Sequence, residues 1–448
     1  MSRLKASRTQ FGPSGTTQRG SALLIVVLGL SVATLASLLL AGRSLLTEQR
    51  TALLQWHNTQ ATQTAEAGLA WGLAALNTGR VSATCQPTSD LRAQPLAHQM
   101  TQTDLSTYEL RPAAMNGVTS LQRPGCQAQD LGWVCRCPSQ PLPAGLAGLN
   151  PWVEDRPAFE VHLAAVPTRA PQSLRLHAVG CSRAKASCLT TGTALPPEAA
   201  ASVSMVVGRV PHLRVMPTAA ITAAGDIRVA APVQSPWVVS SNAPSSSSVD
   251  LRAGGTLQIQ AGSPPILRPD STPATGAAQD PWLSRLSLAT VERRFATWMG
   301  LSPTLFAQLS SVSTLTCAAQ GCADALASAT ASRPKGTVWV RGLLRLERPV
   351  TLGSAQEPVL LVAEEGLMLD APGSQIFGVV VMPALTTQTA ITPISGLGSV
   401  TGALIALGSL GHPTGKAMPS VRFDPAVVAS VLAHQGEWVR VPGGWRDY

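Results

Sequence analysis

The stretch SALLIVVLGLSVATLASLLLA, residues 21–41, decides the architecture of this chain. It contains no charged residue, and the first acidic residue of the whole chain is Glu48. As a helix it would extend about 32 Å at roughly 1.5 Å per residue, which is enough to cross a bilayer core of about 30 Å. We therefore expect a transmembrane helix over residues 21–42.

Residues 1–20 form a basic and polar segment ahead of this stretch. Their charged side chains are Arg3, Lys5, Arg8 and Arg19. Such a flank holds the N-terminus in the cytoplasm and sends the C-terminus across the membrane. Two ordinary interpretations are open. One is a secretory signal cut near Ala41, although the apolar core of such signals is normally about 7–15 residues, and the other is an anchor that is never cut.

The junction between this leader and the apolar stretch, QRGSALLI at residues 18–25, supports a third interpretation. The basic leader ends in Gly20, and the apolar run starts at Ser21. This resembles the prepilin peptidase site of type IV pilins and of type II secretion pseudopilins. The resemblance implies that prepilin peptidase cuts between Gly20 and Ser21 and that the new Ser21 amine is methylated. The apolar helix would then stay on the mature protein.

Ile25 occupies the fifth position of the mature chain, where major pilins carry a glutamate. The pairing of that glutamate with a neighbour's N-terminal amine is therefore absent. Large minor pilins of the PilX-like type also lack the acid, as does the tip pseudopilin of type II secretion. From its start to about Asn77 the chain resembles PilX-like pilus assembly proteins, on the segments RGSALLIVVLGLSV from Arg19 and TAEAGL from Thr64.

Residues 43–79 are predicted to continue the helix outside the membrane. No proline occurs between Pro13 and Pro87, so nothing forces a break, and Gly79 suits a helix stop. Apolar residues recur mostly at three-, four- or seven-residue spacing, as in an amphipathic stripe. They are Leu46, Leu53, Ala61, Ala65, Leu69, Leu73 and Leu76. We expect one helix of about 80 Å, half in membrane or filament core and half against a globular head.

Length and composition predict further domains after the helix. The chain has 448 residues, of which 45% are hydrophobic and 13% charged, so a large core is possible and we expect two or three domains. The net charge of +9 falls to about +5 (9 − 4) without the leader. Because no run of basic residues occurs, we do not expect a nucleic-acid partner.

Eight cysteines follow the apolar helix, on the side that would be exported, and this favours disulfides. They are Cys85, Cys126, Cys135, Cys137, Cys181, Cys188, Cys317 and Cys322. Cys181 and Cys188 are close enough to close a small loop. Cys317 and Cys322 are as well. The other four allow three connectivities, among which the sequence does not choose. The C-x-C pair at 135–137 has no nearby histidine, so we expect no metal site.

Residues 80–215 are predicted to form a disulfide-containing, pilin-like head. Strand candidates that alternate apolar with polar residues are 158–164, 174–179 and 202–210. We expect them to form a small antiparallel sheet packed on the preceding helix. His162 and His177 fall on the polar phase of their strands, so we expect them at the surface.

Residues 216–448 show short apolar bursts separated by glycines and small residues. Strands of three to five residues at this density favour a parallel β-solenoid, in which each rung buries its inward side chains on the next. A β-sandwich, with longer strands, is the alternative. A helical insertion at about 263–335 would hold a small aromatic core of its own and end in the Cys317–Cys322 loop. The predicted fold class is therefore α+β.

The same region resembles the long PilX-like minor pilins in its order of elements. The resemblance rests on AITAAGDIRVAAP at 220–232, on the run from GTVWVRG to GVVVM at 336–382, and on VPGGWRD at 441–447. We find no motif of hydrolases, proteases or nucleotide-binding proteins in the sequence context that such a motif requires. The candidate carboxylates for glycoside hydrolysis are Asp226, Asp250, Glu364, Glu365 and Asp370, which form no recognisable pair. We expect neither enzymatic activity nor a cofactor.

The resemblance implies a type IV pilus minor pilin that is cut by prepilin peptidase and assembled through its N-terminal helix. Its partners would be other minor and major pilins, the inner-membrane assembly platform and a tip adhesin. The missing acid at Ile25 and the bulky head favour the filament tip, where the chain would prime assembly or present an adhesive surface. It would be a single-pass inner-membrane protein with its C-terminal domain in the periplasm, and then part of the pilus at the cell surface.

Two alternatives are open. The first is a tip pseudopilin of a type II secretion system. The second is a membrane-anchored or secreted β-solenoid that binds or degrades carbohydrate.

Overall fold

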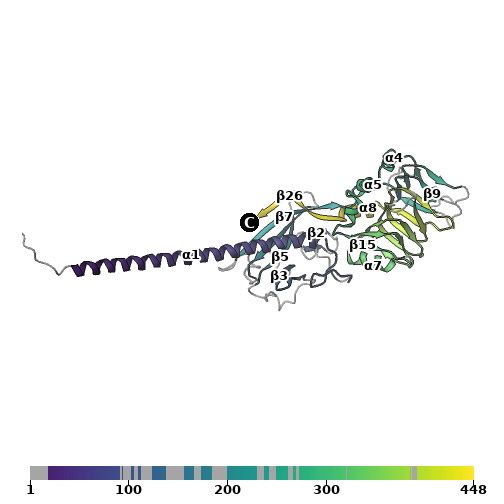
Figure 1. The fold of residues 1–448 in the computed structure, drawn as a ribbon. Helices are drawn as coiled ribbons and strands as arrows, with labels where there is room; N and C mark the ends of the chain where they lie inside the picture. Colours follow the sequence, from purple (N-terminus) through teal and green to yellow (C-terminus); the bar gives the residue numbers. More distant parts are fainter. Residues whose placement is uncertain are drawn as a thin grey trace, which may run out of the picture.

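The computed structural model describes residues 19–90, 93, 102–104, 109–111, 124–137, 156–165, 173–183, 199–229, 237–241, 249–260, 266–268, 272–318, 320–383, 385 and 391–447. The fold is α+β and has three parts in a row. Figure 1 shows a long helix that projects from the molecule, a middle part whose strands lie along the end of this helix, and a second group of strands beyond it.

Helix α1, Arg19–Leu76, is the first part. It runs unbroken through Gly29 and Gly42, because no proline interrupts its hydrogen bonds. It covers the segment predicted to span the membrane and most of the predicted continuation. By length and composition α1 is apolar enough to cross a membrane. The helix ends just before Gly79, where the N–H groups of Asn77 and Thr78 still donate to carbonyls three residues back.

The middle part is a six-stranded antiparallel sheet in the order β26-β7-β6-β5-β3-β4. The strands are β3 Gly125–Gln129, β4 Gly132–Arg136, β5 Ala158–Ala165, β6 Ser173–Cys181, β7 Ala200–Pro211 and β26 Gly436–Asp447. The second half of α1 packs across β5, β6 and β7. This head sheet contains the three strands expected between residues 80 and 215, β5, β6 and β7, together with β3, β4 and β26. A separate antiparallel pair joins β1 Gln102–Asp104 to β2 Glu109–Arg111.

The additional strand, β26, departs from the expectation that residues 216–448 form one domain. It pairs with β7 from Gly436↔Pro211 to Asp447↔Val203, with an irregularity between Arg440 and Trp445. Without β26, β7 would be an edge strand with a row of unpaired backbone groups. The region between β7 and β26 is therefore an insertion between two neighbouring strands of the head sheet.

The inserted region is mostly β-structure, built from one sheet of twelve strands and one of six, and every ladder between its named strands is parallel. The strands are β8 Ile221–Ala223, β9 Ile227–Val229, β10 Trp237–Ser241, β11 Leu251–Ala253, β12 Leu257–Ile259, β13 Ile266–Leu267, β14 Gly276–Ala277, β15 Val312–Thr316, β16 Thr337–Arg341, β17 Leu343–Arg345, β18 Thr351–Leu352, β19 Val359–Ala363, β20 Gly366–Leu369, β21 Gln375–Met382, β22 Ile391–Gly396, β23 Ser399–Ala406, β24 Ser409–His412 and β25 Ser420–Phe423.

The chain does not fill these sheets in sequence order. β23 pairs with β8 through Leu404↔Ile221, and β24 pairs with β9 through Leu410↔Ile227. The first strands of the region therefore lie against its last ones, and the chain enters the parallel sheets near their middle. Their buried side chains form one continuous hydrophobic core.

Four helices lie in or near the expected insertion: α4 Pro281–Ser287, α5 Val291–Met299, α6 Pro303–Ala307 and α7 Ala323–Ser332. The segment also contains β13, β14 and β15, which join the parallel sheets, so it is not purely helical. Phe295 and Phe306 contact each other and Trp339 of β16. The aromatic residues therefore belong to the shared core and not to a core of their own. A last helix, α8 Pro425–His434, leads into β26.

Candidate functional site: the exposed helix and its seat on the head sheet

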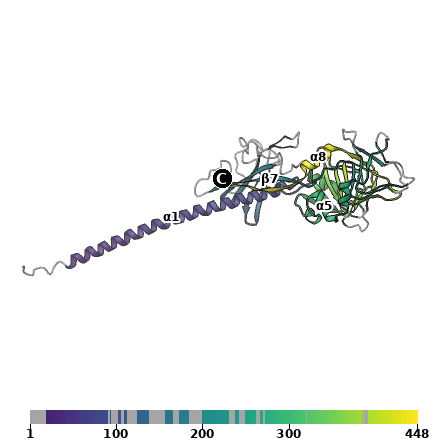
Figure 2. The same ribbon diagram turned by 90° about the horizontal axis from the view of Figure 1, so that it is seen from above.

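The first half of α1 presents a long, exposed and apolar surface. Every large apolar side chain from Leu23 to Trp56 is exposed, Ile25 among them. Exposure drops from 58% at Trp56 to 3% at His57. The free part is about 50 Å long at roughly 1.5 Å per residue, and it stands clear of the rest of the molecule in Figures 1 and 2. Apolar surface of this extent requires lipid or other apolar helices around it.

The stretch from Arg43 to Trp56 is amphipathic, unlike the uncharged stretch before it. At about 100° per residue its large apolar side chains fall mostly within about 100° of arc. Those within this arc are Leu45, Leu46, Leu53 and Trp56, which we call the α1 stripe, whereas Leu54 lies on another side of the helix. Ser44, whose hydroxyl donates to Glu48, lies on another side of the helix. One face of this stretch can therefore pack on an apolar partner while the other meets water.

The buried half of α1 sits unusually close to the head sheet because both surfaces are made of small residues. A Cβ at Gly180 of β6 would collide with the backbone of Ala65 and Ala61. Gly68 faces Phe159, and a Cβ there would lie 3.0 Å from its ring. Glycine thus permits the two backbones to approach, and the close contact fixes where the helix leaves the head.

The end of α1 is anchored to the other two parts. The Asn77 side chain exchanges two hydrogen bonds with the Trp438 backbone in β26. The Arg80 N–H donates to the Ser332 carbonyl at the end of α7 at 2.7 Å. The Arg209 guanidinium lies 4.5 Å from the centre of the Trp438 ring, and burial lowers the pKa of Arg209 to about 10. These contacts were not signalled in the sequence, because each joins residues far apart in the chain.

His212 lies where the chain passes from the head into the parallel sheets. Its Nδ1 lies 2.7 Å from the Thr337 hydroxyl, and its Nε2 lies 3.0 Å from the Ser311 hydroxyl. Burial, together with the charge of Arg333, lowers the pKa of His212 to about 4. The neutral ring therefore links the start of the insertion to Ser311, just before β15, and to Thr337 of β16.

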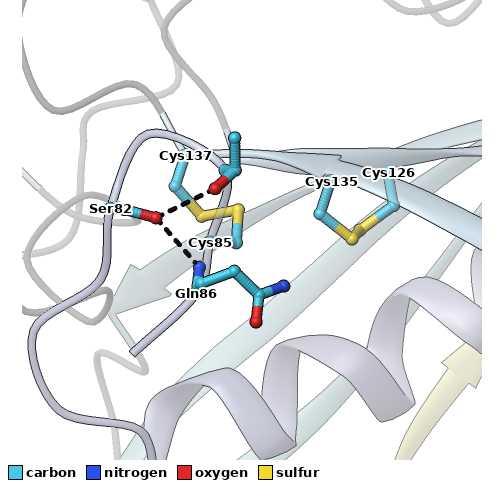
Figure 3. Close-up of a disulfide and its surroundings, with 7 residues drawn as sticks. Ser82, Cys85, Gln86, Cys126, Cys135 and Cys137 are labelled. Atoms are coloured by element: carbon cyan, nitrogen blue, oxygen red, sulfur yellow. Dashed lines mark hydrogen bonds between the residues drawn. A yellow bond between two sulfur atoms is a disulfide. The ribbon is translucent and has the colours of Figure 1, made fainter. Parts of the chain in front are cut away.

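The disulfides of the head hold the β3–β4 hairpin (Figure 3). Cys126 pairs with Cys135, its direct neighbour across the two strands, and Cys85 pairs with Cys137. This selects one of the three connectivities that the sequence left open. The Ser82 hydroxyl accepts from the Gln86 N–H beside Cys85 and orders this loop (Figure 3).

The remaining cysteines lie in two other places. Cys317 and Cys322 form a disulfide at the start of α7. Cys181 is also disulfide-bonded, whereas Cys188 lies outside the described residues.

The predicted processing residues lie at the start of α1. Gly20 and Ser21 are its second and third residues, and residues 1–18 of the leader lie outside the described part of the chain. Ile25 is exposed on the free helix, one turn after Ser21. The predicted cleavage site therefore lies in the first turn of the described part of the helix.

The surface position expected for His162 and His177 is wrong. Both rings are buried, and they stack at 4.9 Å as direct neighbours on β5 and β6. Glu160 and Ser204, on the same face of the sheet, are also buried. Both faces are thus covered, so alternation of polar residues did not mark a surface. Burial and the charge of Arg175 lower the pKa of His177 to about 4.

Four of the carboxylates considered for catalysis bind side chains or backbone groups of other segments of the inserted region. Asp226 accepts from the Thr256 N–H, which holds the pKa of Asp226 below its usual range. Glu364 accepts from the Trp339 indole at 2.6 Å. The other contacts of this kind are Asp250 with Arg268 at 2.9 Å and Asp370 with Arg345 at 2.6 Å. Glu365 also has an interaction partner.

Comparisons with known proteins add little to this geometry. No protein-family model matches the chain, and no curated protein matches it. Among solved structures, the competence-associated pilin ComZ from Thermus thermophilus is similar over 88% of this chain and 97% of that chain. The identity is 12% and the TM-score 0.21, a level that does not establish a common fold.

Proposed function

We propose that this chain is a large minor pilin of a type IV pilus and that it assembles through α1. The observation that carries the proposal is the change from exposed to buried at residue 57 of one unbroken helix. A helix that only anchored the chain would need apolar surface for the bilayer alone, about 20 residues. Here the α1 stripe adds apolar surface beyond Arg43, the first charged residue after the uncharged run at 21–41, as packing between helices outside the lipid requires.

Processing by prepilin peptidase, with methylation of Ser21, follows from the junction at Gly20 and Ser21. The cut would remove the basic leader, with Arg19 and Gly20 at the start of α1, and leave the helix from Ser21 to Leu76 on the mature chain. The partners are then other minor and major pilins and the inner-membrane assembly platform. The chain would start in the inner membrane, with its head in the periplasm, and end in the pilus at the cell surface.

A position at the filament tip is supported by two features of the chain. Ile25 offers no carboxylate for the amine of a subunit ahead of it. The inserted parallel sheets also make the head much larger than the antiparallel sheet alone (Figure 1). We assign the chain to the PilX-like type on these grounds, with a structural role in priming or adhesion and no enzymatic one.

We further propose that the inserted region is a parallel β-solenoid. Its ladders are parallel, and many of its strands pair with one that lies a turn of chain further on. Leu360 of β19 pairs with Val379 of β21, and Ile221 of β8 pairs with Leu251 of β11. Stacked turns of this kind bury their inward side chains on each other, whereas immunoglobulin-type sandwiches are antiparallel.

The mature N-terminus tests the proposal directly. Mass spectrometry of the full chain from sheared filaments should find N-methylated Ser21. A Gly20→Val variant should keep its leader and stay in the membrane fraction. A chain beginning near Arg43, or an uncut Met1 in the unaltered protein, would overturn the assignment. Recovery in a secretion-system pseudopilus instead of surface filaments would favour the tip pseudopilin.

A further inference from the structure

A half-exposed tryptophan lies on the surface of the inserted region, where α4 meets α5. Both helices are in the part of the molecule farthest from the free start of α1 (Figure 1). Trp282 of α4 is 45% exposed, and its ring meets the ring of Trp298 of α5 edge-on, with 5.6 Å between their centres. Trp298 itself is buried. The Trp282 ring is therefore held by a core residue and still offers apolar surface to a ligand.

Arg294 lies on the side of α5 that carries Trp298. The two residues are four positions apart on the helix, so their side chains are neighbours. Arg294 is half-buried, and in the described part of the chain its Nε has no hydrogen-bond partner and its guanidinium forms no ion pair. Burial lowers the pKa of Arg294, and the charge of Glu292 offsets this only in part. This cation therefore lacks the anion that a buried guanidinium needs.

The indole nitrogen of Trp298 is a second buried donor without an acceptor among the residues that the structure describes. Buried polar groups in native proteins are nearly always hydrogen-bonded to protein or to ordered water, so two neighbouring exceptions require an explanation. Neither Arg294 nor Trp298 can accept a hydrogen bond through these nitrogens. The missing partner is therefore a group rich in acceptor oxygens.

The charge of this surface is positive. α4 carries Arg285, one turn after Trp282, and α5 carries Arg293 directly before Arg294. Both helices are described in full, and Glu292 is the one acid within them. This surface therefore favours an anionic ligand.

α4 is held in place by the strand before it. Asp280, which caps the helix, accepts from the Trp282 N–H at 3.0 Å and pairs with Arg252 of β11 at 3.1 Å. The Ser284 hydroxyl donates to the Gly254 carbonyl, and a Cβ at Gly254 would collide with the backbone of α4. A preformed site of this kind loses little conformational entropy when a ligand binds.

The ligand that these groups fit is a sugar with a carboxylate, such as a uronic acid residue of a polysaccharide. Its carboxylate can pair with the Arg294 guanidinium through two parallel hydrogen bonds. Its ring has a face of C–H groups that can pack on the indole of Trp282. An acidic peptide has no ring beside its carboxylates, and a nucleic acid strand is bound by several stacking rings along a basic groove.

We propose that Trp282 and Arg294 bind an acidic saccharide, with the sugar ring on the indole and the sugar carboxylate on the guanidinium. Trp298 positions Trp282, and Arg285 adds positive charge beside the indole. This inference goes beyond the proposed function and does not rest on it, because no residue of α1 takes part.

Binding of a short oligogalacturonate to the full chain in detergent tests the class of ligand. Isothermal titration calorimetry at low salt should show binding. The fully methyl-esterified oligosaccharide, which keeps the rings but lacks the charge, should bind at least tenfold more weakly, and so should polyglutamate and single-stranded DNA of similar length. Absence of oligogalacturonate binding, or equal or tighter binding of any of the other three, would overturn the proposal.

Two variants locate the site. Arg294→Gln and Trp282→Ala should each weaken oligogalacturonate binding at least tenfold. The matched control is Arg293→Gln, which makes the same change of charge one residue away, about 140° around α5 from Trp298. It should weaken binding about twofold at most. Equal losses in Arg294→Gln and Arg293→Gln would assign binding to the general positive charge and overturn the site.

The stability of the free chain distinguishes a binding residue from a structural one. Because the Arg294 Nε has no hydrogen-bond partner in the described part of the chain, Arg294→Gln should leave the midpoint of thermal unfolding unchanged or raise it. Oligogalacturonate should raise the midpoint of the unaltered chain but not that of the variant. A lower midpoint of the free variant would show that Arg294 supports the fold instead and would overturn its assignment to the ligand.

The saccharide site and the pilin assignment fail separately. A chain that binds oligogalacturonate through Arg294 but keeps Met1 would retain this site and lose the pilin assignment. A chain that begins at Ser21 and enters filaments but binds no acidic saccharide would lose the site and remain a pilin.

Discussion

The side chain of Asn77 and the backbone of Trp438 bind each other twice. The Asn77 amide donates to the Trp438 carbonyl at 3.0 Å, and its oxygen accepts from the Trp438 N–H at 2.8 Å. Asn77 ends the helix that would hold the chain in a membrane or filament, and Trp438 lies on the strand that returns from the inserted region. This pair therefore joins the helix directly to the last strand of the chain.

Replacing Asn77 by alanine should destabilise the head. The change leaves a buried N–H and a buried carbonyl of Trp438 without partners, at about 1–3 kcal/mol for each unsatisfied group. We expect the midpoint of thermal unfolding in detergent to fall by several degrees. The matched control is Asn58→Ala, an exposed site on the same helix, which should change the midpoint little. An unchanged midpoint for Asn77→Ala would show that the two hydrogen bonds contribute nothing to stability.

Replacing Gly180 by alanine should separate α1 from the head sheet. The added methyl group collides with the backbone of Ala61 and Ala65, and overpacking of this kind costs about 1–3 kcal/mol. We expect faster proteolysis of α1 near His57 and a lower unfolding midpoint. Gly29→Ala is the control, since nothing lies within 4 Å of its added methyl group. Equal behaviour of the two variants would contradict the close contact.

The junction at His212 should make stability depend on pH. Burial lowers the pKa of His212 to about 4, whereas an unfolded histidine titrates near about 6.5. Between these values the unfolded chain binds more protons than the folded chain, so the free energy of unfolding decreases as pH falls from about 6.5 to about 4. Denaturant titrations across this range should show the decrease.

The variant His212→Gln provides the control for this dependence. It keeps a side chain that can hydrogen-bond to Thr337 or Ser311 but removes the titrating group. The pH slope should therefore become smaller by about one proton's contribution, and the slope from His177 should remain. An identical slope in the variant would assign the dependence to other groups.

The insertion between β7 and β26 should be removable. Pro211 and Gly436 are direct partners across these strands, so replacing residues 212–435 by Asn-Gly would close a two-residue hairpin. We expect the shortened chain to fold in detergent, with Cys126–Cys135 and Cys85–Cys137 formed. A scrambled disulfide map would show instead that the head needs the parallel sheets to fold.

The sequence predicted helix α1 well, because a helix depends on patterns that are local in the sequence. Three local features predicted this helix. They are the uncharged run at 21–41, the absence of proline between Pro13 and Pro87, and the spacing of the apolar residues. Three strands of the head sheet, β5, β6 and β7, were also recognisable from alternation, whereas β3, β4 and β26 were not predicted. Alternation failed for His162 and His177, because it separates the two faces of a strand but does not tell whether the second face is covered.

The sequence by itself determined that this chain has a long apolar helix, a cysteine-bearing head and many short strands after it. Only the tertiary structure decided that β26 joins β7, that β8 lies against β23 and that Cys85 pairs with Cys137. Backbone hydrogen bonds are the same for every residue but proline, so a strand's sequence does not name its neighbour. The choice is made when side chains far apart in the chain, such as those of Asn77 and Trp438, meet in one packed core.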